Sequence, residues 1–345
     1  MKAATFFDGT RWREGVVGVD DDERMLLRGE PAASDLPRFE GVIVGGFTDH
    51  HVHLQLVEHE RLAGSRLGRV VDLGANPGVV ASYASAACVG PLRSRGDRNG
   101  DGLRSSSEER SDETKRATRI EYAGAFLTPV GGYPSDRSWA PAGSFREIAH
   151  TRDAVAAVAE MADAGASCIK VASNSSAGPV FDDILLRVLV EAARTRGLPI
   201  VAHAEGRGEA QRVAGLGAAT LAHAPFTERL TDEEIAEQAA SVSWISTLAI
   251  HAGADLHVAL DNVRRFHGAG GSVRYGTDMG NGPTPVDVNP LEVAALREAG
   301  IDDIALLRAL APVDPRDPAS VLLVLPHRDA DPTLARPLTT ADLEA

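Results

Sequence analysis

The segment GGFTDHHVH, residues 45–53, decides how this sequence is interpreted. An apolar stretch ends here in His51 and His53, which are two positions apart. Residues two apart in a strand project from the same face of a sheet, so both imidazoles would point to one place. One such pair is weak evidence by itself, because polar histidines also occur in ordinary loops. The residues at the ends of the later strands decide between these interpretations.

Short apolar strands alternate with helical stretches from Gly46 onward, an order typical of a parallel sheet covered by helices. The helix predicted at 181–196, for example, repeats Ile184, Val188 and Ala192 along one apolar stripe. Thr231 and Glu234 have the spacing of a capping box, which predicts a helix start. The predicted strands are 46–51, 70–73, 122–128, 168–172, 200–204, 220–223, 244–248 and 273–277. These eight strands favour an α/β fold of the TIM-like (β/α)8 barrel type over residues 46–318.

The first 45 residues follow a different pattern. Short alternating strands at 16–19, 25–28 and 42–44, broken by turns, predict a small β-rich flap or sandwich rather than a barrel unit. We expect residues 319–345, approximately, to complete this small domain, although the segment 314–325 carries only a weak pattern for such a return.

A polar, Gly- and Ser-rich segment at 91–117 predicts an insertion between the second and third strands. Within it, Asp97 to Glu108 has the spacing of a calcium-binding loop. Arg104 stands where such loops carry an apolar residue, and no entering helix precedes the loop. The plain polar insertion is therefore the preferred interpretation, and calcium binding is the alternative.

Composition excludes several classes of function. The 345 residues include 35 Lys and Arg against 49 Asp and Glu, a net charge of −14, which disfavours nucleic acid as a partner. Asp8 interrupts the N-terminal apolar residues before a signal-peptide core develops, and no apolar run reaches transmembrane length. We expect a cytoplasmic protein that binds a small-molecule substrate and no membrane, with Cys88 and Cys168 as free thiols. The sequence leaves a homo-oligomer open.

Four further strands end in residues that can ligate a metal ion. Lys170, His203, His223 and Asp278 follow one another on the fourth, fifth, sixth and eighth predicted strands. Active sites of (β/α)8 barrels lie at the carboxyl ends of the strands. Candidate ligands at five strand ends are improbable if each of them is an unrelated structural residue.

With these motifs the sequence resembles the amidohydrolase superfamily, in particular its imidazolonepropionase-like and metal-dependent prolidase-type branch. The matching stretches are GGFTDHHVH, AGASCIKVAS, GLPIVAHAEG, LGAATLAHAP, SWISTL and VRYGTD, in order over about residues 40–300. The resemblance is specific for the superfamily and not for a substrate.

The resemblance implies two divalent metal ions, zinc in the first instance with manganese as the alternative. His51, His53 and Asp278 would bind the more buried ion, and His203 and His223 the more exposed one. Lys170 would bridge the ions as a carbamate formed with CO2, because a free ammonium cannot ligate a cation. The alternative for Lys170 is an ion pair with a carboxylate such as Asp278.

The implied activity is hydrolysis of an amide-type C–N bond in a dipeptide, an N-acyl amino acid or a cyclic amide. A metal-bridging hydroxide would attack the carbonyl, and Asp278 would move the proton from the nucleophile to the leaving nitrogen. Two alternatives are a deaminase on the same barrel and a non-catalytic assembly protein that has lost its metals.

Several polar and aromatic residues lie just after predicted strand ends, where loops would form the substrate pocket. Arg137 or His251 is a candidate for binding a substrate carboxylate. Cys168 is two positions before Lys170 and is expected to pack in the core. The full set of candidate substrate-binding residues is Tyr133, Arg137, Trp139, Asn174, His251 and Asn281.

Overall fold

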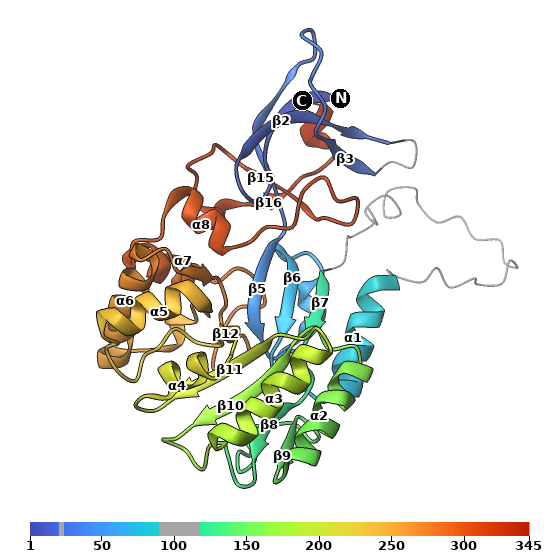
Figure 1. The fold of residues 1–345 in the computed structure, drawn as a ribbon. Coiled ribbons are helices and arrows are strands. Elements are labelled where there is room, and N and C mark those ends of the chain that lie inside the picture. The colour runs from blue at the N-terminus through green and yellow to red at the C-terminus, as the bar shows by residue number, and fades with distance from the viewer. Residues whose placement is uncertain (21–23, 90–117, 345) are drawn as a thin grey trace, which may run out of the picture.

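The computed structural model describes residues 1–20, 24–89 and 118–344 (Figure 1). The insertion predicted at 91–117 and its calcium-loop pattern from Asp97 to Glu108 lie outside the described residues. The side chain of Cys88 is likewise outside the described part. No helix within the described ranges is long and apolar enough to cross a membrane.

Both ends of the chain contribute to one six-stranded sheet, which holds the two termini close together in Figure 1. Its strand order is β16-β15-β4-β1-β2-β3. Strand β15 pairs antiparallel with β4, so the return of the chain that the sequence only weakly indicated is present. Strand β1 was not predicted, and it runs parallel to β4. The strands are β1 (Lys2–Phe7), β2 (Trp12–Val19), β3 (Met25–Arg28), β4 (Arg38–Gly45), β15 (Leu322–Leu325) and β16 (Arg336–Pro337).

The middle of the chain forms two parallel sheets. A three-stranded sheet contains β5 (Phe47–Val52), β6 (Leu67–Asp72) and β7 (Arg119–Tyr122). A seven-stranded sheet has the order β14-β13-β12-β11-β10-β8-β9. Its strands are β8 (Phe126–Pro129), β9 (Phe145–Ile148), β10 (Ile169–Asn174), β11 (Ile200–Glu205), β12 (Thr220–Leu221), β13 (Ser243–Ile245) and β14 (Ser272–Arg274). The mixed α/β class with parallel strands is therefore as the sequence predicted.

The prediction of one continuous third strand over Tyr122–Thr128 was wrong. The segment is divided into β7 and β8 because Gly124 adopts a positive φ of 76° between them. Strand β9 was not predicted.

Backbone hydrogen bonds connect the two parallel sheets at both edges of the smaller one. Beside β5, the amide of His50 donates to the carbonyl of Tyr275 at 3.0 Å, and the amide of His53 donates to that of Met279 at 2.7 Å. Beside β7, the amide of Ser167 donates to the carbonyl of Tyr122 at 2.8 Å. Strand β5 is thereby held next to the segment that follows β14, although the two are more than 200 residues apart in sequence.

Helices lie along the outer side of the parallel strands (Figure 1). The predicted capping box is confirmed, since the Thr231 hydroxyl accepts from the Glu234 amide and the Glu234 carboxylate accepts from the Thr231 amide. The α-helices are α1 (Pro77–Val89), α2 (Thr151–Asp163), α3 (Asp183–Thr195), α4 (Glu209–Gly215), α5 (Asp232–Ser241), α6 (Gly253–Gly268), α7 (Pro290–Glu298), α8 (Asp303–Ala309) and α9 (Ala341–Glu344). Short 3-10 helices are η1 (Leu54–Leu56), η2 (His59–Leu62), η3 (Leu248–Ile250) and η4 (Pro332–Leu334).

Aromatic packing fixes α6 against the sheet. Trp244 on β13 is fully buried and stacks on Phe266 of α6 with ring centroids 3.8 Å apart. Its indole N–H donates to Gln238 Oε1 on α5 at 3.0 Å, so burial of the ring leaves no polar atom without a partner. Cys168 is buried and free, as expected of a packing residue.

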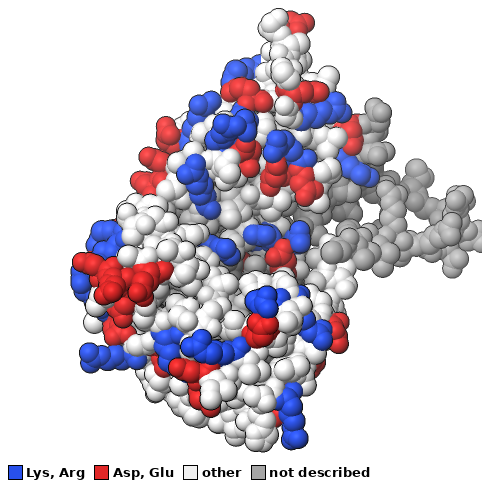
Figure 2. All heavy atoms as spheres, in the orientation of Figure 1, with Lys and Arg blue, Asp and Glu red and all other residues white. Residues whose placement is uncertain are grey.

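Basic and acidic side chains are interspersed over the face of the molecule drawn in Figure 2. An extended positive surface of the kind that binds a phosphate backbone is therefore not found on this face.

Asn262 on α6 holds the loop that follows β12. Its side chain is fully buried, and its Nδ2 donates to the carbonyls of Pro225 and Glu228 at 2.9 and 2.8 Å. Its Oδ1 accepts from the amide of Leu230 at 3.0 Å. Three buried or partly buried backbone groups thus depend on one side chain, and their loop contains Phe226, which lines the cavity described below.

We predict that Asn262→Ala lowers the free energy of unfolding by about 3 kcal/mol, because three buried backbone groups lose their partners. Asp261→Ala is the matched control on the same helix. Asp261 pairs with Arg229 at the surface at 2.9 Å, and its loss should cost about 1 kcal/mol or less. Denaturant unfolding measures both variants. Equal losses in the two variants would contradict the role given to Asn262.

Candidate metal centre

A cavity of about 210 Å³ is lined by side chains from β5, β8, β10 and β11 and from the loops after β8, β12, β13 and β14. The structure brings most of the candidate site residues together in its walls. The candidates that line it are His51, His53, Tyr133, Lys170, His203, His223, His251, Asp278 and Asn281.

Backbone carbonyls fix the orientation of the two imidazoles that begin the sequence argument. His51 Nδ1 lies 2.8 Å from the carbonyl oxygen of Ala222, and His53 Nδ1 lies 3.3 Å from that of Gly74. A carbonyl can only accept, so each Nδ1 carries the proton. Burial holds the pKa of His51 well below its usual value, so this ring is neutral near pH 7 and its Nε2 presents a lone pair.

Both Nε2 atoms face the same carboxylate oxygen. Asp278 Oδ1 lies 3.2 Å from Nε2 of His51 and 3.1 Å from Nε2 of His53. It is buried and accepts no hydrogen bond from a described residue. Burial raises the pKa of Asp278, but the neighbouring imidazoles outweigh that effect and hold it well below its usual range. A carboxylate oxygen and two imidazole nitrogens therefore converge at one point, a donor set that fits a divalent cation.

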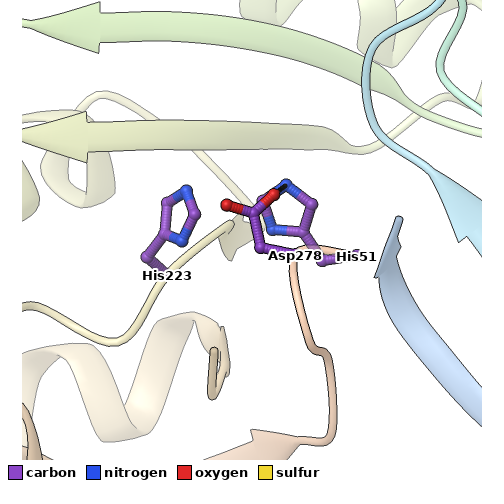
Figure 3. Close-up of side chains that lie close together, drawn as sticks. All are labelled: His51, His223 and Asp278. Atoms are coloured by element: carbon purple, nitrogen blue, oxygen red, sulfur yellow. Dashed lines mark ion pairs between the residues drawn. The ribbon is translucent and has the colours of Figure 1, made fainter. Parts of the chain in front are cut away.

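His223 joins this group from the loop after β12. One ligand atom each of His51, His223 and Asp278 lies within 4.8 Å of the others, and all three residues are buried. Figure 3 shows the Asp278 carboxylate between the two imidazoles. Burial also holds the pKa of His223 well below its usual value, so it too is a neutral nitrogen donor. Imidazole and carboxylate together are a donor set suited to zinc and similar transition metals.

Two residues in the segments that follow β13 and β14 adopt left-handed backbone conformations. Thr247 has φ 42° and Asp278 has φ 53°. This conformation is unfavourable for a β-branched residue and costs of the order of 1 kcal/mol or more. In return, Thr247 Oγ1 lies 2.9 Å from His223 Nδ1 and fixes the direction of that ring.

His203 is held by a residue that the sequence analysis did not single out. Its Nε2 lies 3.1 Å from Glu205 Oε2, which also accepts from Asn174 Nδ2 at 2.7 Å. This hydrogen bond to His203 lowers the pKa of Glu205. The same two-residue spacing that relates His51 to His53 would have identified Glu205. Phe126, Phe226 and Ile250 also line the cavity and had no comparable sequence signal.

Lys170 is fully buried in the cavity wall without a polar partner. Its side chain is 1% exposed, and Nζ accepts or donates no hydrogen bond within the described part of the chain. No ion pair joins it to Asp278 or to another described carboxylate within 4.0 Å, contrary to the ion-pair alternative. Burial lowers the pKa of Lys170 to about 8.

Three candidate substrate-binding residues are not among those that line the cavity. Asn174 is turned to Glu205 and Ser176, while Trp139 is 40% exposed. Arg137 pairs with Asp136 at 3.3 Å and lies over the ring of Tyr133. Sequence position after a strand end was insufficient to tell wall residues from those outside the wall.

Asp49 on β5 links this strand to the segment that carries Asp278. Its Oδ1 accepts from the amides of His51 and Thr277 at 3.0 and 3.1 Å, and its Oδ2 accepts from the Thr277 hydroxyl at 2.6 Å. The side chain is fully buried. Burial raises the pKa of Asp49 to about 7 despite these bonds. Asp49 thus positions ligands on both sides of the site through their backbone.

We predict that Asp49→Ala destabilises the metal-free protein by about 3 kcal/mol, because three buried donors lose their acceptor. Asp49→Asn should stay within about 1 kcal/mol of wild type at pH 7, since its oxygen serves both amides and its NH2 group donates to the Thr277 hydroxyl. Denaturant midpoints for both variants measure the effect. An Asn variant as unstable as the Ala variant would contradict this role.

The comparison of wild type with Asp49→Asn also gives a prediction for the dependence of stability on pH. The folded-state pKa of Asp49 is raised, so the folded protein holds more protons than the unfolded chain between about pH 4 and pH 7. The contribution of Asp49 to stability is therefore fully present below the unfolded pKa and is lost as pH rises towards 7. The stability of wild type relative to Asp49→Asn should decrease across this window. A flat difference would contradict the raised pKa.

No protein-family model matches the sequence, and no curated protein matches it. Solved structures do match its fold. A. niger ochratoxinase has a TM-score of 0.67 and 15% identity, covering 94% of this chain and 90% of that one. A putative prolidase from Bifidobacterium longum has a TM-score of 0.66 and 20% identity, with coverages of 96% and 88%. An Xaa-Pro dipeptidase has a TM-score of 0.64 and 16% identity, with coverages of 96% and 93%.

Another matching structure is an amidohydrolase, at a TM-score of 0.64 and 15% identity. All of these identities are low, and the similarity extends over nearly the whole of each chain. The chain therefore shares its overall fold with these solved structures.

Proposed function

We propose that the chain is a metal-dependent hydrolase that cleaves an amide-type C–N bond. The observation that carries the proposal is the convergence of Asp278 Oδ1 with Nε2 of His51 and Nε2 of His53, at 3.2 and 3.1 Å, in a buried group that His223 joins. The solved structures that share the fold, which include a dipeptidase and an amidohydrolase, support the same class of reaction.

The proposed scaffold is one closed (β/α)8 barrel over residues 46–318, with residues 1–45 and about 319–345 as a separate small domain. The hydrogen bonds at both edges of the three-stranded sheet support closure. A second support is a buried cluster with one member from each of six successive strand regions: Leu73, Ala123, Cys168, Val201, Ala222 and Ile245. Side chains from many strands in mutual contact are typical of a barrel interior.

Two divalent ions, zinc or manganese, are proposed for the cavity. His51, His53 and Asp278 would hold one, and His203 and His223 the other. His223 belongs to the same tight group as His51 and Asp278, which supports two neighbouring ion positions rather than two distant ones. The neutral imidazoles and buried carboxylate fit such ions.

Lys170 would bridge the ions as a carbamate. A neutral amine reacts with CO2 to form a carbamate and release one proton, and the pKa of about 8 makes the neutral amine available near neutral pH. The product is an anion whose two oxygens can each ligate one ion. This would also give the buried Nζ end of Lys170 the polar partners that it lacks among the described residues.

Bound ions would supply Lewis acidity for the scissile carbonyl and lower the pKa of a water molecule. The residues of the chain would handle the proton. Asp278 Oδ1 faces the ligand nitrogens, whereas Oδ2 accepts from Asn281 Nδ2 at 2.8 Å, which fixes the plane of the carboxylate. In this orientation Asp278 would accept the proton of the attacking water and deliver it to the leaving nitrogen.

We predict that protein prepared with zinc or manganese holds about two ions per chain, and that Lys170→Ala holds one or fewer and is inactive. The sequence has three lysines, so ¹³C-labelled bicarbonate should give an NMR carbamate signal that Lys170→Ala lacks. Lys2→Ala is the control, because buried Lys2 already donates to the Asp342 carbonyl at 3.3 Å and should change neither result. Full metal content and full activity in Lys170→Ala would refute the bridge.

We predict that Asp278→Asn lowers kcat by about two to four orders of magnitude, because the amide cannot take the proton from the nucleophile. KM should change far less, since the carboxylate acts mainly in the transition state. Metal content and kinetics are measured on one preparation, with Asp136→Asn outside the cavity wall as control. A metal-loaded Asp278→Asn variant within about tenfold of wild type would exclude the proton-transfer role.

A further inference from the structure

Glu205 is a second carboxylate in the cavity wall, and only one of its two oxygens accepts hydrogen bonds from described residues. Its Oε2 accepts from His203 and Asn174 at 3.1 and 2.7 Å. Its Oε1 accepts no hydrogen bond from a described residue, and 27% of the side chain is exposed. Because Glu205 lines the cavity, the free oxygen is an acceptor available to a bound molecule.

Apart from Lys170, which the proposed carbamate would convert to an anion, the described wall offers no fixed positive charge to a substrate. Its charged side chains are Lys170, Glu205 and Asp278, and it contains no arginine. Arg137 lies outside the wall and pairs with Asp136, but after the hydrogen bond from His203 its charge is among the causes that lower the pKa of Glu205. Burial lowers the pKa of His251, so its imidazole is a neutral donor or acceptor rather than a cation. Recognition of a carboxylate in proteins normally depends on a guanidinium or an ammonium group.

The charge balance of the proposed centre leads to the same result. With two divalent ions bound, the carbamate of Lys170, Asp278 and the deprotonated nucleophile would leave one positive charge. Glu205 cancels that charge. A carboxylate on the substrate would therefore enter a neutral site next to an unpaired Glu205 oxygen, and like charges at such short range repel each other in a partly desolvated cavity.

The remaining walls suit an apolar or aromatic group. Tyr133 is stacked near His203 with ring centroids 5.0 Å apart, and Phe226 lies against His251 at 4.1 Å. Phe126 and Ile250 complete this apolar part of the cavity. The site thus combines apolar walls with one acceptor carboxylate, a combination that favours a ligand with an N–H or ammonium group at one end.

We infer that this site takes amides that are neutral or cationic at the end that meets Glu205, and that it discriminates against amides carrying a free carboxylate there. The inference deepens the proposed hydrolase function and rests on it. Glu205 is the residue that determines this specificity, and Oε1 is the atom that contacts the substrate.

Three benzamides of similar size that differ in their terminal group and its charge test the inference. They are benzoylglycine with a carboxylate, benzoylglycinamide with a neutral amide and N-(2-aminoethyl)benzamide with an ammonium group. Calorimetry measures their binding to wild type with and without zinc, and product formation measures hydrolysis. We expect the ammonium probe to bind at least tenfold more tightly than the carboxylate probe at low salt. Tighter binding of benzoylglycine by wild type would overturn the inference.

Glu205→Gln removes the charge and keeps an oxygen acceptor for Asn174. It should bring the ammonium and carboxylate probes within about threefold of each other. Glu228→Gln is the matched control, because this substitution makes the same change in net charge. Glu228 is 26% exposed, similar to Glu205, and lies outside the cavity wall. An unchanged preference in Glu205→Gln would overturn the inference. The inference would also be overturned if wild type binds benzoylglycine and the Arg137→Met variant does not.

Failure of the inference and failure of the proposed function give different results. Metal-loaded wild type that hydrolyses benzoylglycine in preference to the other two probes retains the hydrolase function and overturns the specificity. Binding in the expected order without hydrolysis of any amide supports the specificity of Glu205 and counts against the hydrolase. Metal content of each variant is measured alongside, and the wild-type binding order decides the specificity even if Glu205→Gln loses an ion.

Discussion

Nε2 atoms of two buried imidazoles and one carboxylate oxygen of Asp278 meet at about 3 Å. Backbone carbonyl groups hold a proton of His51 and of His53 on Nδ1, which directs both Nε2 atoms to that carboxylate. We propose that this convergence is organised for a cation. The neighbouring Lys170 Nζ is buried and has no hydrogen-bond partner among the described residues.

Buried carboxylates hold the loops that carry these groups. Asp49 accepts from the amides of His51 and Thr277, and Asp72 accepts from those of Leu54 and Gly74. Glu292 on α7 accepts from the amides of Leu248 and Ala249 after β13. Each acid satisfies backbone donors at the end of a strand, where regular pairing stops. The cavity is therefore supported by side chains that do not line it.

The two carboxylates that do line the cavity have different surroundings and different proposed tasks. Asp278 is enclosed by imidazoles and is assigned to metal binding and proton transfer. Glu205 has only one imidazole contact and retains a free oxygen, which suits recognition of a substrate group. The difference follows from the backbone position of each residue. Asp278 has a left-handed backbone conformation in the segment after β14, while Glu205 is the last residue of the extended strand β11.

The sequence by itself determined the parallel α/β class and the residues that converge on one cavity, because both depend on local periodicity and on the rule that parallel strands end at one side. Only the tertiary structure decided which loop residues form the wall. Arg137, Trp139 and Asn174 follow predicted strand ends yet lie outside it, whereas Phe226 lines it because α6 holds its loop through Asn262. The free oxygen of Glu205 and the unpaired Lys170 likewise depend on contacts between distant segments. Such contacts leave no local pattern, because they are set by packing rather than by neighbours in the chain.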